Sequence, residues 1–172
     1  MIEVRSNIVL VGMPGSGKST VGVILARRLG MDFVDTDVIL QTAEGRRLQD
    51  IVDRDGYLAL RRVEERVLLS LSLRRHVIAT GGSAVYSTAA MAHLRAGGRV
   101  VFLDADIATL EARVRDFGSR GLAKRADQSF EDLFAERRPL YLSYADLVIP
   151  CGAQIHEEVA EAIAQRLGVP TW

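Results

Sequence analysis

The sequence predicts an α/β fold in three layers, with a five-stranded parallel sheet between two layers of helices. Three observations predict this fold class. Five short apolar runs recur along the chain, helical patterns separate them, and a glycine-rich stretch joins the first run to the first helix. Strands that alternate with helices form βαβ units, whose strands run parallel. The chain has 172 residues, enough for one compact domain, and we expect residues 1–172 to form it.

The expected strands are short and rich in β-branched residues. They lie at residues 7–11, 32–36, 76–80, 99–103 and 146–150. Runs such as NIVLV at 7–11 are continuously apolar rather than alternating. A continuous run is typical of a strand covered on both faces, so helices should lie on both sides of the sheet.

Helical periodicity fills the intervals between these strands. Helices are expected at residues 19–29, 37–45, 48–56, 57–73, 129–145 and 156–168, and one more begins near Ile107. Gly56 separates two helices of this series. Residues 115–128 carry four basic side chains and little apolar periodicity, so we expect a mobile loop there.

The stretch GMPGSGKST, residues 12–20, fits the phosphate-loop pattern G-x-x-x-x-G-K-[ST] at every fixed position. Its glycines let the loop curl and point its N–H groups at phosphate oxygens. Lys18 can reach the β- and γ-phosphates, and the Ser19 hydroxyl can bind Mg²⁺. The candidate nucleotide-binding residues are Gly12, Gly15, Ser16, Gly17, Lys18, Ser19 and Thr20. The alternative is a glycine-rich turn without a ligand, and the coincidence of strand, motif and helix argues against it.

Composition limits the other functions open to the chain. Lys plus Arg and Asp plus Glu both number 22, and the resulting net charge of zero disfavours a nucleic-acid or membrane partner. Cys151 is the only cysteine, so no internal disulfide can form, and no partner motif for a catalytic thiol accompanies it. No apolar run reaches membrane-spanning length, and residues 1–7 do not look like a signal peptide. We therefore expect a cytoplasmic protein.

Phosphate loops serve several classes of protein, which differ in where the terminal phosphate goes. A GTPase needs an Asn-Lys-x-Asp motif to read guanine, and this sequence has none. ATP-driven motors usually carry an acidic residue at the end of a buried strand, a position that Asp104 could fill. We expect Asp104 instead to cap the helix that begins near Ile107. Transfer to a small molecule is the remaining interpretation.

Two carboxylates, Asp35 and Asp37, stand at the carboxyl end of the second expected strand. Ligands bind at this edge of open α/β sheets. Residues i and i+2 of a strand share a face, so both carboxylates could face the phosphate loop. One could hold Mg²⁺ through its water shell, and the other could accept the proton of an attacking hydroxyl. The alternative is a strand-end cap beside a solvated acid.

Further motifs complete an ordered set along the chain. The set consists of GMPGSGKST at 12–20, Asp-x-Asp at 35–37, LRRVEE at 60–65, ATGGSAV at 79–85, an arginine at 120 and ERRPLY at 136–141. It spans nearly the whole chain and resembles the shikimate kinase family. The resemblance implies a sheet of the nucleoside-monophosphate-kinase type, with strand order 2-3-1-4-5. It also implies phosphorylation of shikimate to shikimate 3-phosphate, in aromatic amino acid biosynthesis, with ATP as co-substrate and Mg²⁺ as cofactor.

The resemblance assigns roles on the phosphate side of the site. Lys18 and Ser19 would bind the ATP phosphates and Mg²⁺, and Asp35 would help to hold the metal. Asp37 would bind the substrate hydroxyl and act as the base.

Two arginines are expected to face the nucleotide by the same resemblance. Arg113 would pack against adenine, with residues 150–153 bordering the same ring. Arg120 would close over the γ-phosphate as part of a lid at about residues 115–127. The expected catalytic residues are Asp37, Lys18 and Arg120.

On the acceptor side, the resemblance implies that Arg61 and Arg137 bind the carboxylate of the substrate. A guanidinium fork suits that group well. Each of these arginines has an arginine neighbour, Arg62 or Arg138, and only one of each pair should point inward. Glu64 is expected to brace Arg61 from one helical turn away, or to form an ordinary surface ion pair.

Gly81 and Gly82 match two glycines that bring the backbone close to the substrate. The substrate-binding helices would lie at about residues 37–73. The expected partner is a small hydroxy acid, bound by a monomer.

Three residues depart from the family pattern. Ser83 replaces the last residue of a Gly-Gly-Gly run, and Gly121 replaces a lid proline. Leu60 replaces the aromatic residue that precedes Arg61, the first of the two arginines that form the carboxylate clamp. All three lie on the acceptor side, so the type of reaction is better defined than the substrate. One alternative is a kinase for a related hydroxy acid or polyol such as gluconate. Another is a nucleotide-binding regulatory module without transfer activity.

Overall fold

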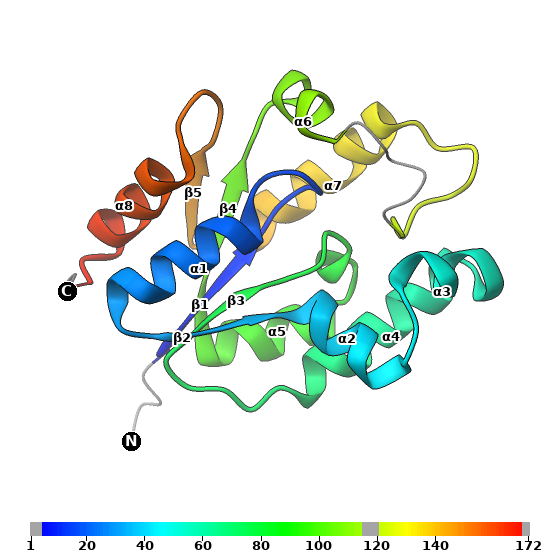
Figure 1. The fold of residues 1–172 in the computed structure, drawn as a ribbon, viewed down its shortest axis with the longest axis horizontal. Coiled ribbons are helices and arrows are strands. Elements are labelled where there is room, and N and C mark those ends of the chain that lie inside the picture. Colours follow the sequence, from blue (N-terminus) through cyan, green and yellow to red (C-terminus); the bar gives the residue numbers. More distant parts are fainter. Residues whose placement is uncertain (1–4, 115–120, 170–172) are drawn as a thin grey trace.

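The computed structural model describes residues 5–114 and 121–169 (Figure 1). Within these residues, five parallel strands form one sheet in the order β2-β3-β1-β4-β5. The strands are β1 (Asn7–Val11), β2 (Asp32–Asp35), β3 (His76–Ala79), β4 (Gly98–Asp104) and β5 (Leu147–Pro150). The predicted fold class, strand positions and strand order are all confirmed, with strand ends that differ by at most one residue.

The central strand β1 is buried along its whole length, as its continuous apolar run predicts. Leu10 of β1 pairs with Ala79 of β3 on one side and with Val101 of β4 on the other. Asp35, the last residue of β2, pairs with Ala79 as well. This register brings the carboxyl ends of β2, β3 and β1 together at one edge, where the phosphate loop follows β1.

The described ranges contain eight α-helices and one 3₁₀ turn, of which α8 follows the last strand and the others connect the strands. They are α1 (Lys18–Leu29), α2 (Thr36–Glu44), α3 (Leu48–Asp55), α4 (Tyr57–Ser70), η1 (Ala84–Tyr86), α5 (Thr88–Gly97), α6 (Ile107–Arg113), α7 (Phe130–Tyr144) and α8 (His156–Leu167). Helices α1 and α8 pack side by side on one face, and α5 and α7 pack on the other (Figure 1). None of these helices is long and apolar enough to cross a bilayer.

The helix ends follow local chemistry. Gly56, with φ of 85°, separates α3 from α4 as expected. The expected cap at Asp104 is wrong: the Asp106 side chain accepts from the Thr109 N–H and caps α6. The Asp104 carboxylate instead accepts two hydrogen bonds from Arg138 on α7, at 3.0 and 2.8 Å. Helix α5, which the sequence analysis did not single out, begins where the Ser87 hydroxyl accepts from a backbone N–H.

Two apolar clusters stabilise the fold. The larger one joins the sheet to the helices on both faces. A smaller one lies among α2, α3 and α4 and includes Leu40, Ile51, Leu60 and Val67, with Ala123 packed into it from the segment before α7. The expected substrate-binding helices therefore have a core of their own. They project beyond the sheet on the side of its carboxyl ends (cyan to green in Figure 1).

Gly22 in α1 permits close packing of that helix against the sheet, and this predicts an unusual effect of mutation. Alanine normally stabilises a helix by about 1 kcal/mol relative to glycine. A Cβ at Gly22 would lie 2.6 Å from Phe33 Cε2, so overpacking should outweigh that gain. We expect Gly22→Ala to lower the free energy of unfolding by about 1 kcal/mol in urea titration.

Val23→Ala is the matched control, because Val23 is 52% exposed on the same helix. Its free energy of unfolding should change by no more than about 0.5 kcal/mol. A Gly22→Ala protein more stable than wild type would contradict the packing argument.

Candidate active site

A pocket of about 620 Å³ lies at the carboxyl edge of the sheet. The phosphate loop, α2, α4, the turn after β3, the segment before α7, and α7 itself all contribute to its walls. Of the residues expected in the site, the lining includes Gly15, Gly17, Lys18, Ser19, Thr20, Asp37, Gly81, Gly82, Arg113 and Arg137. The fold thus brings together most of the motifs that the sequence spreads over more than 120 positions.

The phosphate loop is curled as its sequence predicts. Gly15 and Gly17 have φ of 84° and 93°, which residues with side chains rarely adopt. Lys18 Nζ donates to the carbonyl oxygens of Gly12 and Met13 at 2.8 and 2.9 Å, which fixes the ammonium group over the loop. Burial lowers the pKa of Lys18 to about 8.

Ser16 is buried within the loop, where its N–H donates to the Met13 carbonyl at 3.1 Å. Ser19 and Thr20 are exposed to the pocket. The Ser19 hydroxyl donates to the Asp35 carboxylate. A hydroxyl and a carboxylate side by side are hard oxygen ligands, so these two residues fit the expected Mg²⁺.

The two aspartates reach the site in a different way from the prediction. Asp35 ends β2 and its side chain caps α2, accepting from the Asp37 N–H at 2.9 Å. Asp37 lies in the first turn of α2, so the two residues do not share a strand face. Asp37 still lines the pocket, where burial and the charge of Asp35 raise its pKa to about 6. A carboxylate with such a pKa is a better base at neutral pH than an ordinary one.

Gly81 and Gly82 allow the backbone after β3 to approach charged side chains. A Cβ at Gly81 would lie 2.3 Å from Glu64 Oε1 and 2.7 Å from Asp37 Oδ1. A Cβ at Gly82 would lie 2.7 Å from a terminal guanidinium nitrogen of Arg137. No larger residue fits either position without displacing a side chain of the site.

Arg61 and Arg137, the two arginines expected to bind the substrate carboxylate, both donate to the carbonyl oxygen of Ala123. Arg137 is 1% exposed, and its Nη2 donates to the Ala123 carbonyl at 3.0 Å. Arg61 Nη2 donates to the same oxygen at 3.3 Å. Arg138 points elsewhere and pairs with Asp104. The prediction that one arginine of each pair points inward is therefore confirmed for Arg137 and Arg138. Arg62, although exposed, lines a recess together with Arg61.

Arg61 itself lines a recess of about 280 Å³ beside the main pocket. The two cavities share Glu64 and Ser83 as lining residues. The clamp therefore spans a boundary between them, with Arg137 on the side of the phosphate loop.

Glu64 does not brace Arg61, so that expectation is wrong. The Ser83 hydroxyl donates to Glu64 Oε2, while Oε1 is buried without a partner among the described residues. Burial and the charge of Asp37 raise the pKa of Glu64 to about 7. Ser83, one of the departures from the family pattern, thus holds a buried carboxyl group at the acceptor end of the pocket.

Arg113, the last residue of α6, lines the pocket. Its terminal nitrogens donate to the carbonyls of Gly15 and Gly152, at 3.4 and 3.3 Å. It therefore joins the phosphate loop to the loop at residues 150–153. Arg120 lies outside the described residues, and its role remains a prediction.

Gly121 explains why this chain carries no proline there. Its N–H donates to Gln49 Oε1 at 2.6 Å and its φ is 62°. Proline has no N–H and fixes φ near −65°, so it suits neither feature.

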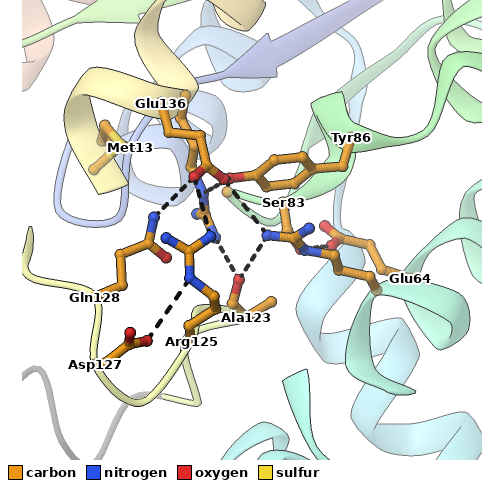
Figure 2. A network of polar contacts seen from close by, with 12 residues as sticks. Met13, Glu64, Ser83, Tyr86, Ala123, Arg125, Asp127, Gln128 and Glu136 are labelled. Carbon is orange, nitrogen blue, oxygen red and sulfur yellow. Dashed lines mark hydrogen bonds and ion pairs between the residues drawn. The ribbon is translucent and has the colours of Figure 1, made fainter. Parts of the chain in front are cut away.

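Sequence reasoning missed several residues of the site. His156 lines the pocket from the start of α8, and Ala123 supplies the shared carbonyl oxygen. Tyr86 of η1 contacts both clamp arginines. Figure 2 shows its hydroxyl beside Glu136. No motif marks these residues, because each enters the site through a tertiary contact.

The strand order, the phosphate loop and the pocket beside it define a P-loop kinase of the nucleoside-monophosphate-kinase type. Thymidylate kinase from Candida albicans has the same fold, with a TM-score of 0.60 over 95% of this chain and 91% of that one, at 12% sequence identity.

Comparisons with known proteins define the family. The family model for shikimate kinase matches residues 14–168. A shikimate kinase from Gloeobacter violaceus is 40% identical over 168 residues, covering 94% of each chain. A solved shikimate kinase from Acinetobacter baumannii, in complex with shikimate, has a TM-score of 0.88 and 32% identity over 96% of this chain and 94% of that one. The chain belongs to the shikimate kinase family, as the ordered motifs indicate.

The buried carboxyl group of Glu64 predicts a pH-dependent gain in stability on its removal. Because its folded pKa of about 7 is above the unfolded value of 4.5, its contribution to stability is present below pH 4.5 and is lost as the pH rises through 7. We expect Glu64→Gln to match wild type at pH 4. At pH 8 its free energy of unfolding should be higher by on the order of 3 kcal/mol.

Denaturant titrations at both pH values measure this difference. Glu65→Gln is the control for loss of a neighbouring carboxylate on α4, since Glu65 is less buried and accepts from the Ser87 hydroxyl. Equal stability changes at pH 4 and pH 8 in Glu64→Gln would contradict the assignment.

Proposed function

We propose that this protein transfers the γ-phosphate of ATP to a hydroxyl of shikimate, giving shikimate 3-phosphate in aromatic amino acid biosynthesis. The observation that carries the proposal is the convergence of Arg61 and Arg137 on one oxygen atom, in a site that also holds Asp37. Two cations on one oxygen suit a carboxylate, and a nearby carboxylate base suits a hydroxyl. Family membership and the shikimate bound to the Acinetobacter baumannii protein support the choice of acid.

On the nucleotide side, the N–H groups of residues 12–20 and Lys18 bind the phosphates of ATP. Ser19 and Asp35 hold Mg²⁺, which when bound neutralises phosphate charge. Arg113 packs against adenine beside residues 150–153. The position of Arg113 between two loop carbonyls supports this role.

On the acceptor side, Arg61 and Arg137 bind the carboxylate, and the glycines at 81 and 82 give the substrate close access to the backbone. Asp37 orients the hydroxyl and takes its proton as the phosphoryl group is transferred. Arg120 would then stabilise the charge on the transferred group, as the family resemblance implies. Catalysis by this arrangement is mainly positioning and charge neutralisation.

The protein is proposed to act as a monomer on its small substrate. A kinase for gluconate or a related polyol is less favoured, because the solved relative at 32% identity is described with shikimate. A regulatory module is also less favoured, because an inactive protein has no need of a buried cation such as Arg137.

The proposal is tested by ADP release from purified protein with Mg²⁺ and ATP, with and without shikimate. We expect shikimate to stimulate ADP release by orders of magnitude at micromolar to millimolar concentration. Asp37→Asn should abolish most of this stimulation and keep affinity for ATP. Stimulation by gluconate but not by shikimate would identify a different acceptor, and no stimulation by any hydroxy acid would overturn the proposal.

The carboxylate clamp is tested by paired substitutions on α4. Arg61→Ala should raise the KM for shikimate roughly tenfold to a hundredfold, because a hydrogen bond to a charged group contributes about 1.5–3 kcal/mol. Arg66→Ala removes the same charge from an exposed position of α4 outside both cavities, and should leave this KM unchanged. Equal effects of the two substitutions would contradict a specific role for Arg61.

A further inference from the structure

Tyr86 lies between the two arginines of the clamp. The centre of the Arg61 guanidinium is 3.5 Å from the centroid of the Tyr86 ring, a cation–π contact. Arg137 Nε donates to the Tyr86 hydroxyl at 3.3 Å. One side chain therefore contacts both guanidinium groups. The ring lies closest to Arg61, and the hydroxyl accepts from Arg137, whose guanidinium centre is 5.4 Å from the ring centroid.

Little else holds the Arg61 side chain in place. Its Nε is buried without a hydrogen-bond partner among the described residues. The hydrogen bond to Ala123 is long at 3.3 Å, and the ion pair with Glu136 is longer still at 3.9 Å. Glu64, one helical turn away, accepts from Ser83 instead. The ring of Tyr86 is therefore the main surface against which the guanidinium rests.

The Tyr86 hydroxyl is fixed from the opposite side. It donates to Glu136 on α7, and Gln128 Nε2 donates to the other oxygen of that carboxylate at 2.9 Å. Burial and the hydrogen bond to Glu136 raise the pKa of Tyr86. The phenol thus stays protonated, and its oxygen remains available to accept from Arg137.

An aromatic contact from η1 also accounts for a departure from the family pattern. The aromatic residue expected just before Arg61 is Leu60 here, and Leu60 packs in the small core of α2, α3 and α4. The ring of Tyr86, in η1, stacks on the Arg61 guanidinium. The centroid of the Tyr57 ring, on α4, lies 5.1 Å from the centre of the same guanidinium. Aromatic support for Arg61 thus comes from outside position 60.

We propose that Tyr86 is a positioning residue that orients both clamp arginines and so sets the affinity for the carboxylate of the acceptor. This inference rests on the proposed function, because it concerns the same clamp. A side chain that orients the clamp should affect binding of the acid far more than transfer of phosphate or binding of ATP.

Two substitutions separate the ring from the hydroxyl. Tyr86→Leu removes both contacts and should raise the KM for shikimate about tenfold, the factor that corresponds to a cation–π contact of intermediate strength. Tyr86→Phe keeps the ring over Arg61 and should raise it by a smaller factor, about twofold to fivefold. In both proteins kcat and the KM for ATP should stay within about threefold of wild type. Tyr144→Phe, which removes a tyrosine hydroxyl outside the pocket, is the control.

A neutral acceptor distinguishes positioning from a merely structural role. With the carboxamide analogue of shikimate, the clamp no longer meets a negative charge. The penalty of Tyr86→Leu should then shrink to within about twofold. An equal loss of affinity for the acid and for the amide would overturn the inference.

A measurement on the free protein keeps this inference separate from the proposed function. The Nε–H signal of Arg137, assigned by its loss in Arg137→Lys, should exchange faster with water in Tyr86→Phe than in Tyr144→Phe. Wild type without shikimate-dependent turnover would contradict the proposed function alone. Unchanged arginine signals in both Tyr86 variants would overturn the positioning role whatever the acceptor.

Discussion

The site depends on the burial of two basic and two acidic side chains close together in one pocket. Lys18 and Arg137 bring two cations, and Asp37 and Glu64 bring two acids, all within the same pocket. Desolvation lowers the pKa of Lys18 and raises those of both acids, so these three groups are less stable in their charged forms than they would be in water. The four groups are tolerated together because each cation offsets part of the charge of the acids. Gly81 and Gly82 make this arrangement possible, because a side chain at either position would collide with one or more of these charged groups.

Such an arrangement favours function at some loss of stability. A carboxyl group that titrates near neutral pH is a destabilising element of the folded state, yet at Asp37 it is the property that a general base needs. The loss of stability is confined to the site, because the main apolar core lies between the sheet and the helices that cover its two faces. The helices α2 to α4 carry a separate small core, so the acceptor side can vary without disturbing the sheet.

The sequence predicts the sheet almost completely, because each strand is a local apolar run and the order follows from the family resemblance. The sequence also identifies Lys18, Asp37 and Arg137 as residues that line the pocket, although Asp37 reaches it from α2 and not from a strand face shared with Asp35. It fails where partners are tertiary. Helical spacing pairs Glu64 with Arg61, but Ser83 comes closer to the carboxylate. The contact of Tyr86 with Arg137 joins residues 51 positions apart, and no periodicity in the chain predicts it.

Two of the three departures from the family pattern, Ser83 and Leu60, lie close to Arg61. Ser83 engages Glu64, and Leu60 contributes to the small core rather than to the guanidinium. The aromatic ring that lies against Arg61 is that of Tyr86. The departures thus alter how the clamp is held, while Asp37, Arg61 and Arg137 themselves are kept. A binding group can thus be held by contacts from another element, as long as those contacts keep its guanidinium group in a fixed orientation.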